Sequence, residues 1–178
     1  NDISSAAPDT DFIIYNIPQL AGVSLTIPLL REMKKNPKVI GVKNSSMPVQ
    51  DIQMFHDEGV IVFNGPDEQF ISGLAAGAVG GIGGTYAAMP ELFIKARELF
   101  YEGKIEAAGA VQNDICRIIY KMCSTHGNMY AAIKEIIRIQ GGPDVGSVRA
   151  PLAELIEEDK LIAQECAKMI EEAVKKYC

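Results

Sequence analysis

The stretch Lys38-Val-Ile-Gly-Val-Lys43 is a short run of β-branched residues between two lysines, and polar Asn44-Ser-Ser46 follows it at once. Runs of this length and composition are typical of β-strands. A run without polar alternation is typical of a strand that is covered on both faces, as in a parallel sheet. We therefore expect a buried strand that ends near Lys43.

Three further runs of the same kind flank this strand. They are Asp11-Phe-Ile-Ile-Tyr-Asn16, Gly59-Val-Ile-Val-Phe-Asn64 and Ala78-Val-Gly-Gly-Ile-Gly83. The segments between the runs have helical patterns with start signals, such as Thr26-Ile-Pro28 before Leu29 and Leu30. Strands that alternate with helices are typical of a parallel α/β sheet. We predict strands near residues 11–16, 38–43, 59–64 and 78–83.

The chain changes character after Pro90, where only helical patterns follow, at about 91–101, 105–122, 128–139 and 152–176. A complete (β/α)8 barrel needs roughly 250 residues, whereas this chain has 178. We predict the second, C-terminal half of such a barrel in residues 1–102 and a helical C-terminal extension in residues 103–178. A small doubly wound sheet is the alternative, but Gly80-Gly-Ile-Gly-Gly84 overlaps the last strand and does not fit a dinucleotide-binding turn.

Composition excludes several classes of function. The formal charge is −6 and no basic cluster is present, which argues against a nucleic-acid partner. No apolar run is long enough to cross a bilayer, and residues 1–5 do not resemble a signal peptide. We expect a cytoplasmic protein without membrane association.

The four cysteines, Cys116, Cys123, Cys166 and Cys178, lie in helical sequence and lack metal-ligand spacing. We expect no metal site. Cys116 and Cys123 are expected to be small buried residues of one helix face in a reducing compartment.

Lys43 is the first candidate for chemistry, because ligands bind at the carboxyl ends of parallel strands. Val39, Gly41 and Lys43 share one face, so the amine lies at the rim of an apolar layer. Partial desolvation favours the neutral amine, which attacks a ketone or aldehyde to form an imine. The simpler alternative is a solvated lysine that pairs with a helix carboxylate.

Tyr15 lies near the end of the preceding strand and shares a face with Ile13, so it could point toward the same opening, where its phenol could relay a proton. Without Lys43 beside it, a tyrosine that caps the core would be the preferred interpretation. Asp67 and Glu68 begin a helix, where acidic residues also serve the helix dipole. His56 and His126 are most simply solvated helix residues.

Four motifs together resemble the N-acetylneuraminate lyase and dihydrodipicolinate synthase family. They are Tyr15-Asn-Ile-Pro18, Gly41-Val-Lys43, Asn64-Gly-Pro-Asp-Glu68 and Gly80-Gly-Ile-Gly-Gly-Thr-Tyr86. Their order and spacing agree with the second half of that family, and the Val148-Arg-Ala-Pro151 loop fits as well. The resemblance implies a class I aldolase that needs no cofactor beyond the covalent imine of pyruvate on Lys43, with Tyr15 as the proton carrier.

The resemblance also implies a set of substrate contacts. Pyruvate and a sugar acid would be the ligands, with the polyhydroxy chain held by Ser45, Gly65, Asp67 and Glu68. Ile82 would approach the pyruvyl portion through its backbone. Gly84 belongs to the same substrate-binding set, but it stands where the lyases usually have a serine and so lacks that hydroxyl ligand. Because Gln19-Leu20 replaces the Gly-Arg that usually follows in dihydrodipicolinate synthases, we expect cleavage of N-acetylneuraminate to pyruvate and N-acetylmannosamine.

Other functions stay open at this point. Dihydrodipicolinate synthase and a 2-keto-3-deoxy sugar acid aldolase are alternatives within the family. The Gly-Ser/Thr-Thr-Gly-Glu turn that holds the pyruvate carboxylate in the family is not found here. We therefore expect this chain to be a fragment that works beside the missing N-terminal half of the barrel. A catalytically silent assembly unit is the alternative from another class, and a homo-oligomer is expected because the family is usually tetrameric.

Overall fold

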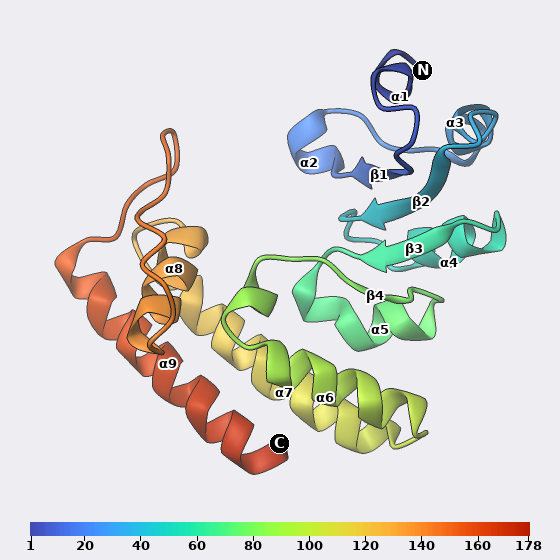
Figure 1. Cartoon of the computed structure of the whole chain (residues 1–178). Coiled ribbons are helices and arrows are strands. Elements are labelled where there is room, and N and C mark those ends of the chain that lie inside the picture. The colour runs from blue at the N-terminus through green and yellow to red at the C-terminus, as the bar shows by residue number, and fades with distance from the viewer. The chain divides into compact units, whose positions relative to one another are not determined.

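The computed structural model describes residues 1–178 and divides into two compact units, Asn1–Gly83 and Gly84–Cys178. The first unit contains all the strands (Figure 1). It contains α1 (Asp2–Ala6), β1 (Phe12–Asn16), α2 (Pro18–Ala21), α3 (Ile27–Met33), β2 (Val39–Asn44), α4 (Gln50–Asp57), β3 (Ile61–Asn64), η1 (Asp67–Gln69), α5 (Phe70–Ala75) and β4 (Gly80–Gly81). The expected boundary at residue 102 divides the chain by its proposed relation to a barrel and stays a prediction.

The four strands form one parallel sheet in the order β1-β2-β3-β4. All neighbours are parallel, with Tyr15 opposite Lys43, Lys43 opposite Phe63, and Phe63 opposite Gly80. The α/β class with a parallel sheet is confirmed. The strand order follows the chain without the reversal that a doubly wound sheet requires, which argues against that alternative.

One face of the sheet packs against helices α3 and α4. Val42 and Val62 of the sheet are fully buried against Leu30, Ile52 and Phe55. The start of α3 is fixed by Thr26, whose hydroxyl accepts a hydrogen bond from the Leu29 N–H at 3.3 Å. The same face therefore provides the hydrophobic core of this unit.

The opposite face of the sheet remains partly open to solvent. Strand alternation places every second side chain there. Those of Ile13, Tyr15 and Ile61 are 41%, 52% and 42% exposed. An apolar sheet face of this kind is normally covered by another layer of protein.

The second unit is helical. It contains η2 (Thr85–Ala87), α6 (Pro90–Tyr101), α7 (Ile105–Met122), α8 (Met129–Ile139) and α9 (Glu157–Tyr177). Helix α6 packs against α7, and α9 packs against α6, α7 and α8. Buried apolar residues of these helices form its core, among them Leu92, Val111, Ile115, Ile119, Met122, Ile136, Ala163 and Ile170. No helix of the structure combines the length and apolarity needed to span a bilayer.

Helix α9 begins at Glu157, five positions later than the predicted start at 152. The Ala153 carbonyl accepts a hydrogen bond from the Asn128 N–H at 2.9 Å, so the backbone there is engaged outside a helix. Asp159 then accepts the Ile156 N–H at 3.1 Å and fixes the first turn. Residues 152–156 were predicted to be helical, but their backbone is held outside the helix by these hydrogen bonds to other parts of the unit.

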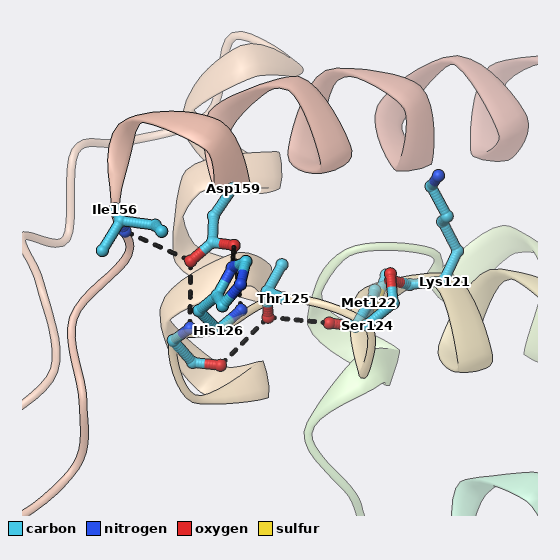
Figure 2. A network of polar contacts seen from close by, with 8 residues as sticks. Lys121, Met122, Ser124, Thr125, His126, Ile156 and Asp159 are labelled. Atoms are coloured by element: carbon cyan, nitrogen blue, oxygen red, sulfur yellow. Dashed lines mark hydrogen bonds and ion pairs between the residues drawn. The ribbon is translucent and has the colours of Figure 1, made fainter.

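Asp159 joins the start of α9 to the turn between α7 and α8 (Figure 2). Its carboxylate, fully buried, accepts hydrogen bonds from the backbone N–H groups of His126 and Gly127, both at 2.9 Å. The His126 ring Nδ1 lies 3.1 Å from the same carboxylate. Burial alone raises the pKa of Asp159, but the hydrogen bonds from His126, Gly127 and Ile156 outweigh it and hold the pKa well below its usual range.

Two expectations about single side chains are corrected in this region. His126 lies in the turn after α7, where it contacts Asp159, and is not a helix residue. Cys123 is exposed, because α7 ends at Met122 and Cys123 is its C-cap. Cys166 is buried as a small core residue, and burial raises the pKa of its thiol to about 11.

We expect Asp159→Asn to lower the Tm by about 5 °C or more, because an amide cannot accept all of the donors that now converge on the carboxylate. The depressed pKa means that Asp159 contributes stability above the unfolded-state pKa of about 4, and that this contribution is lost as the pH falls. The Tm difference should therefore be largest at neutral pH and shrink in acid. Thermal melts across pH, with Glu158→Gln as the exposed control, test this, and an unchanged Tm would contradict it.

Candidate active site

Lys43 and Tyr15 are brought together at the carboxyl ends of β2 and β1. They are register partners, and the Lys43 Nζ lies 3.9 Å from the centroid of the Tyr15 ring. Lys43 is half-buried, whereas Tyr15 is 52% exposed. An ammonium over an aromatic face is attracted by the ring, which holds the amine at the open face of the sheet.

Ser45 and Gly65 lie side by side just beyond the ends of β2 and β3. The Gly65 N–H donates to the Asn44 carbonyl at 2.7 Å. A Cβ atom at Gly65 would lie 2.1 Å from the Ser45 Oγ and 2.5 Å from that carbonyl oxygen. Only glycine allows the two loops to approach this closely. The close packing of the loops therefore explains glycine at position 65 without any contact to a ligand.

Asp67 lies against the backbone that follows β4. Its side chain is 6% exposed, and a Cβ at Gly83 would fall 1.6 Å from its Oδ1. Glu68, the next residue, is exposed. The sequence motif suggests that Asp67 and Glu68 act as a pair, but one side chain is buried and the other is exposed.

Ile82 directly follows β4, and its N–H donates to the Asn64 carbonyl at 2.9 Å. Its side chain is 43% exposed. The first unit thus contains seven of the eight predicted site residues: Tyr15, Lys43, Ser45, Gly65, Asp67, Glu68 and Ile82.

Gly84 belongs to the second unit, where it lies against α8. A Cβ at this position would be 2.6 Å from Tyr130 Cε1 and 3.4 Å from Ile133 Cδ1. A serine could therefore fit only if the Tyr130 ring moved. The Tyr130 ring therefore lies where a larger side chain at position 84 would extend.

A row of buried asparagines at the strand ends was missed by the sequence reasoning. Asn16, Asn44 and Asn64 end β1, β2 and β3, are in register with one another, and are at most 4% exposed. The Asn16 Nδ2 donates to the Asn44 Oδ1 at 2.7 Å. The signal in the sequence was that each of the three strands ends on the same residue type.

No group of three or more His, Cys, Asp or Glu side chains is placed to hold a metal ion. The reactive groups at the strand ends are the amine of Lys43 and the phenol of Tyr15, with backbone and hydroxyl groups around them. The fold and site therefore define a parallel α/β protein with a lysine at the carboxyl edge of its sheet, the edge at which such folds bind ligands.

Comparison with known proteins agrees with this description. Residues 1–173 match the model of the Dihydrodipicolinate synthetase family. The chain belongs to that family, which confirms the resemblance predicted from its motifs.

Several individual relatives within this family are N-acetylneuraminate lyases or sialic acid aldolases. An N-acetylneuraminate lyase of Mediterraneibacter gnavus is 60% identical over 99% of this chain and 57% of its own length. A catalytic-lysine mutant of the Ruminococcus gnavus sialic acid aldolase matches with a TM-score of 0.96 and 59% identity, over 99% of this chain and 59% of that one. The pyruvate complex of an N-acetylneuraminate lyase from Fusobacterium nucleatum matches with a TM-score of 0.85 and 27% identity, over 95% of this chain and 57% of that one.

The chain spans less than two thirds of the length of each of these relatives. The family and the parallel α/β fold are therefore established for this chain, while the activity of a whole relative is a matter for proposal.

Proposed function

We propose that this chain supplies the imine-forming lysine of a class I aldolase that cleaves N-acetylneuraminate to pyruvate and N-acetylmannosamine. The observation that carries the proposal is the Lys43 amine, held 3.9 Å from the Tyr15 ring at the carboxyl ends of adjacent strands. The 60% identity to an N-acetylneuraminate lyase supports this substrate over the other substrates of the family.

In this reaction the neutral Lys43 amine attacks the keto carbon of the substrate, and water leaves to give a protonated imine. The Tyr15 hydroxyl takes the proton of the C4 hydroxyl as the C3–C4 bond breaks and passes its own proton to the substrate carboxylate, and the bonding electrons move into the imine to form an enamine. N-acetylmannosamine departs as the aldehyde product. The enamine is then protonated at C3, and water releases pyruvate and the free amine.

The remaining site residues have proposed roles in binding. Ser45, Gly65, Asp67 and Glu68 would contact the polyhydroxy chain, and Ile82 would approach the pyruvyl portion. Gly84 would leave a hydroxyl contact of the family unfilled. Four of these residues lie close together around the ends of β2, β3 and β4, which supports a shared ligand site: Ser45 beside Gly65, Asp67 beside Gly83, and Ile82 hydrogen-bonded to Asn64.

We further propose that residues 1–102 form the second half of a (β/α)8 barrel and residues 103–178 its helical extension. Two features of the first unit support this: the partly exposed apolar face of the sheet, and the two edges formed by β1 and β4. A further segment, equivalent to the additional length of the relatives, would cover that face and complete the pyruvate-carboxylate site. The completed protein would be a homo-oligomer, and a reducing cytoplasmic setting would suit its four free cysteines.

The direct test of substrate is product analysis with the completed barrel. N-acetylneuraminate, a 2-keto-3-deoxy sugar acid, and pyruvate with aspartate semialdehyde are offered separately, and the products are separated by chromatography. Release of pyruvate and N-acetylmannosamine is the expected result. Turnover of only one of the other substrates would replace the proposed reaction with dihydrodipicolinate synthesis or sugar-acid cleavage, and no turnover of any would favour a silent assembly unit.

A further inference from the structure

We infer that Asn16 and Asn44 are positioning residues, whose mutual hydrogen bond holds Tyr15 against Lys43. The inference rests on the proposed function, since it concerns the two groups that would carry that reaction. Neither asparagine is expected to touch the substrate.

The hydrogen bond lies directly behind the amine and the phenol. Asn16 follows Tyr15 and Asn44 follows Lys43, so the two pairs are adjacent rungs of one strand ladder. Alternation along the strands places the asparagines on the helix-covered face and the other two residues on the open face. The 2.7 Å bond from Asn16 Nδ2 to Asn44 Oδ1 therefore fixes the position of one strand end relative to the other, at the place where Lys43 contacts Tyr15.

Asn16 is also anchored to the loop that follows its strand. Its Oδ1 accepts the Leu25 N–H at 3.0 Å, and its backbone carbonyl accepts the Ser45 N–H at 2.8 Å. The two contacts connect β1 to the loop before α3 and to the end of β2. The Asn16 side-chain amide is thus oriented at both ends, because its Nδ2 donates to Asn44 and its Oδ1 accepts from Leu25.

Asn44 connects the same network to helix α4. Its Oδ1 lies 3.0 Å from the Ser46 Oγ, which lies 2.6 Å from Asp51 Oδ2 in the first turn of α4. The Ser46 hydroxyl has one hydrogen to donate, so it serves one of these acceptors at a time. The chain of contacts links the strand that bears Lys43 to the helix that follows it.

Stability alone does not account for the Asn44 amide. Its Nδ2 is buried without a hydrogen-bond partner, and a buried donor left unpaired is destabilising. Two positions earlier on the same strand and face, Val42 fills its site with an apolar side chain. Proteins retain such local violations mainly where function requires them.

The test is a double-mutant cycle in the completed barrel, with Asn16→Leu, Asn44→Leu and the double variant. The readouts are the rate of Lys43 labelling by pyruvate and borohydride, and kcat and KM for cleavage. We expect each single change to lower the labelling rate and kcat by about 10- to 100-fold, the size of effect produced by a small misplacement of reacting groups. KM should change much less, and the double variant should be no slower than the worse single variant.

Asn64→Leu is the matched control, because the buried side-chain amide of Asn64 belongs to the same row but donates to the Pro66 carbonyl at 2.7 Å and not to Asn16 or Asn44. It should leave pyruvate labelling of Lys43 unchanged. Equal slowing by Asn64→Leu, additive effects in the cycle, or a folded Asn44→Leu variant with an unchanged rate would overturn the positioning role.

If Asn44→Leu does not fold, Asn44→Asp replaces it, because its carboxylate still accepts from Asn16. A folded Asn44→Asp variant with a nearly unchanged labelling rate supports the inference, and a large loss of rate contradicts it. Failure of the unmodified protein to be labelled at Lys43 is a separate outcome, since it would remove the proposed function itself.

Discussion

Replacing Lys43 with methionine in the completed barrel is expected to lower kcat for N-acetylneuraminate cleavage by about 10⁴-fold or more. Methionine keeps much of the length and apolar volume of the side chain but has no amine, so the imine cannot form. Lys43→Arg should be equally inactive, because guanidinium stays protonated and does not act as a nucleophile. Steady-state kinetics with chromatographic detection of both products provides the measurement.

Lys38→Met is the control for the lysine variants. Lys38 lies immediately before the opposite end of the same strand, and we assign it no role in the reaction. Its kcat should match that of the unmodified protein. Retention of substantial cleavage by a folded Lys43→Met variant would show that another group starts the reaction.

Replacing Tyr15 with phenylalanine is expected to separate the two contributions of that side chain. The ring that faces the Lys43 amine at 3.9 Å is retained, so labelling by pyruvate and borohydride should continue. The phenol is lost, and kcat for carbon–carbon cleavage should fall by about 10²- to 10⁴-fold, the usual contribution of a general acid or base. Tyr15→Leu removes the ring as well and should also slow labelling.

Tyr120→Phe is the matched control for this pair, since Tyr120 is a 66% exposed residue of α7 in the second unit. It should have unchanged kinetics. If Tyr15→Phe cleaves N-acetylneuraminate as fast as the unmodified protein, the proton is carried by another group and the role proposed for the Tyr15 hydroxyl is wrong.

The sequence was sufficient for the parts of the fold that depend on local pattern. Strand alternation and strand order predicted that Tyr15 could point toward the same opening as Lys43, and the structure brings the two residues into register at adjacent strand ends. The helix predicted at 105–122 is observed with those bounds. The glycine-rich run at 78–83 gave only a two-residue strand, Gly80–Gly81, because pairing with β3 is confined to Phe63 and Asn64.

Features that depend on residues far apart in the sequence could not be predicted from local patterns. The start of α9 depends on Asp159 and on a turn that lies 33 positions earlier in the chain. The Asn16–Asn44 bond joins residues 28 positions apart, and neither residue has a hydrophobic pattern that would place it in a buried site. Gly84 was predicted from the family resemblance as a site residue without the serine hydroxyl, whereas its packing against Tyr130 became visible only in the structure.

The central claim is that Lys43 forms an imine with pyruvate. Its most direct test is borohydride reduction in the presence of pyruvate, followed by intact-mass measurement and peptide mapping of the 178-residue chain, alone and with the remaining barrel segment supplied. We expect one reduced pyruvyl group on Lys43 when the barrel is completed. Absence of the adduct in both samples, or its appearance on another lysine, would show that Lys43 does not form the imine.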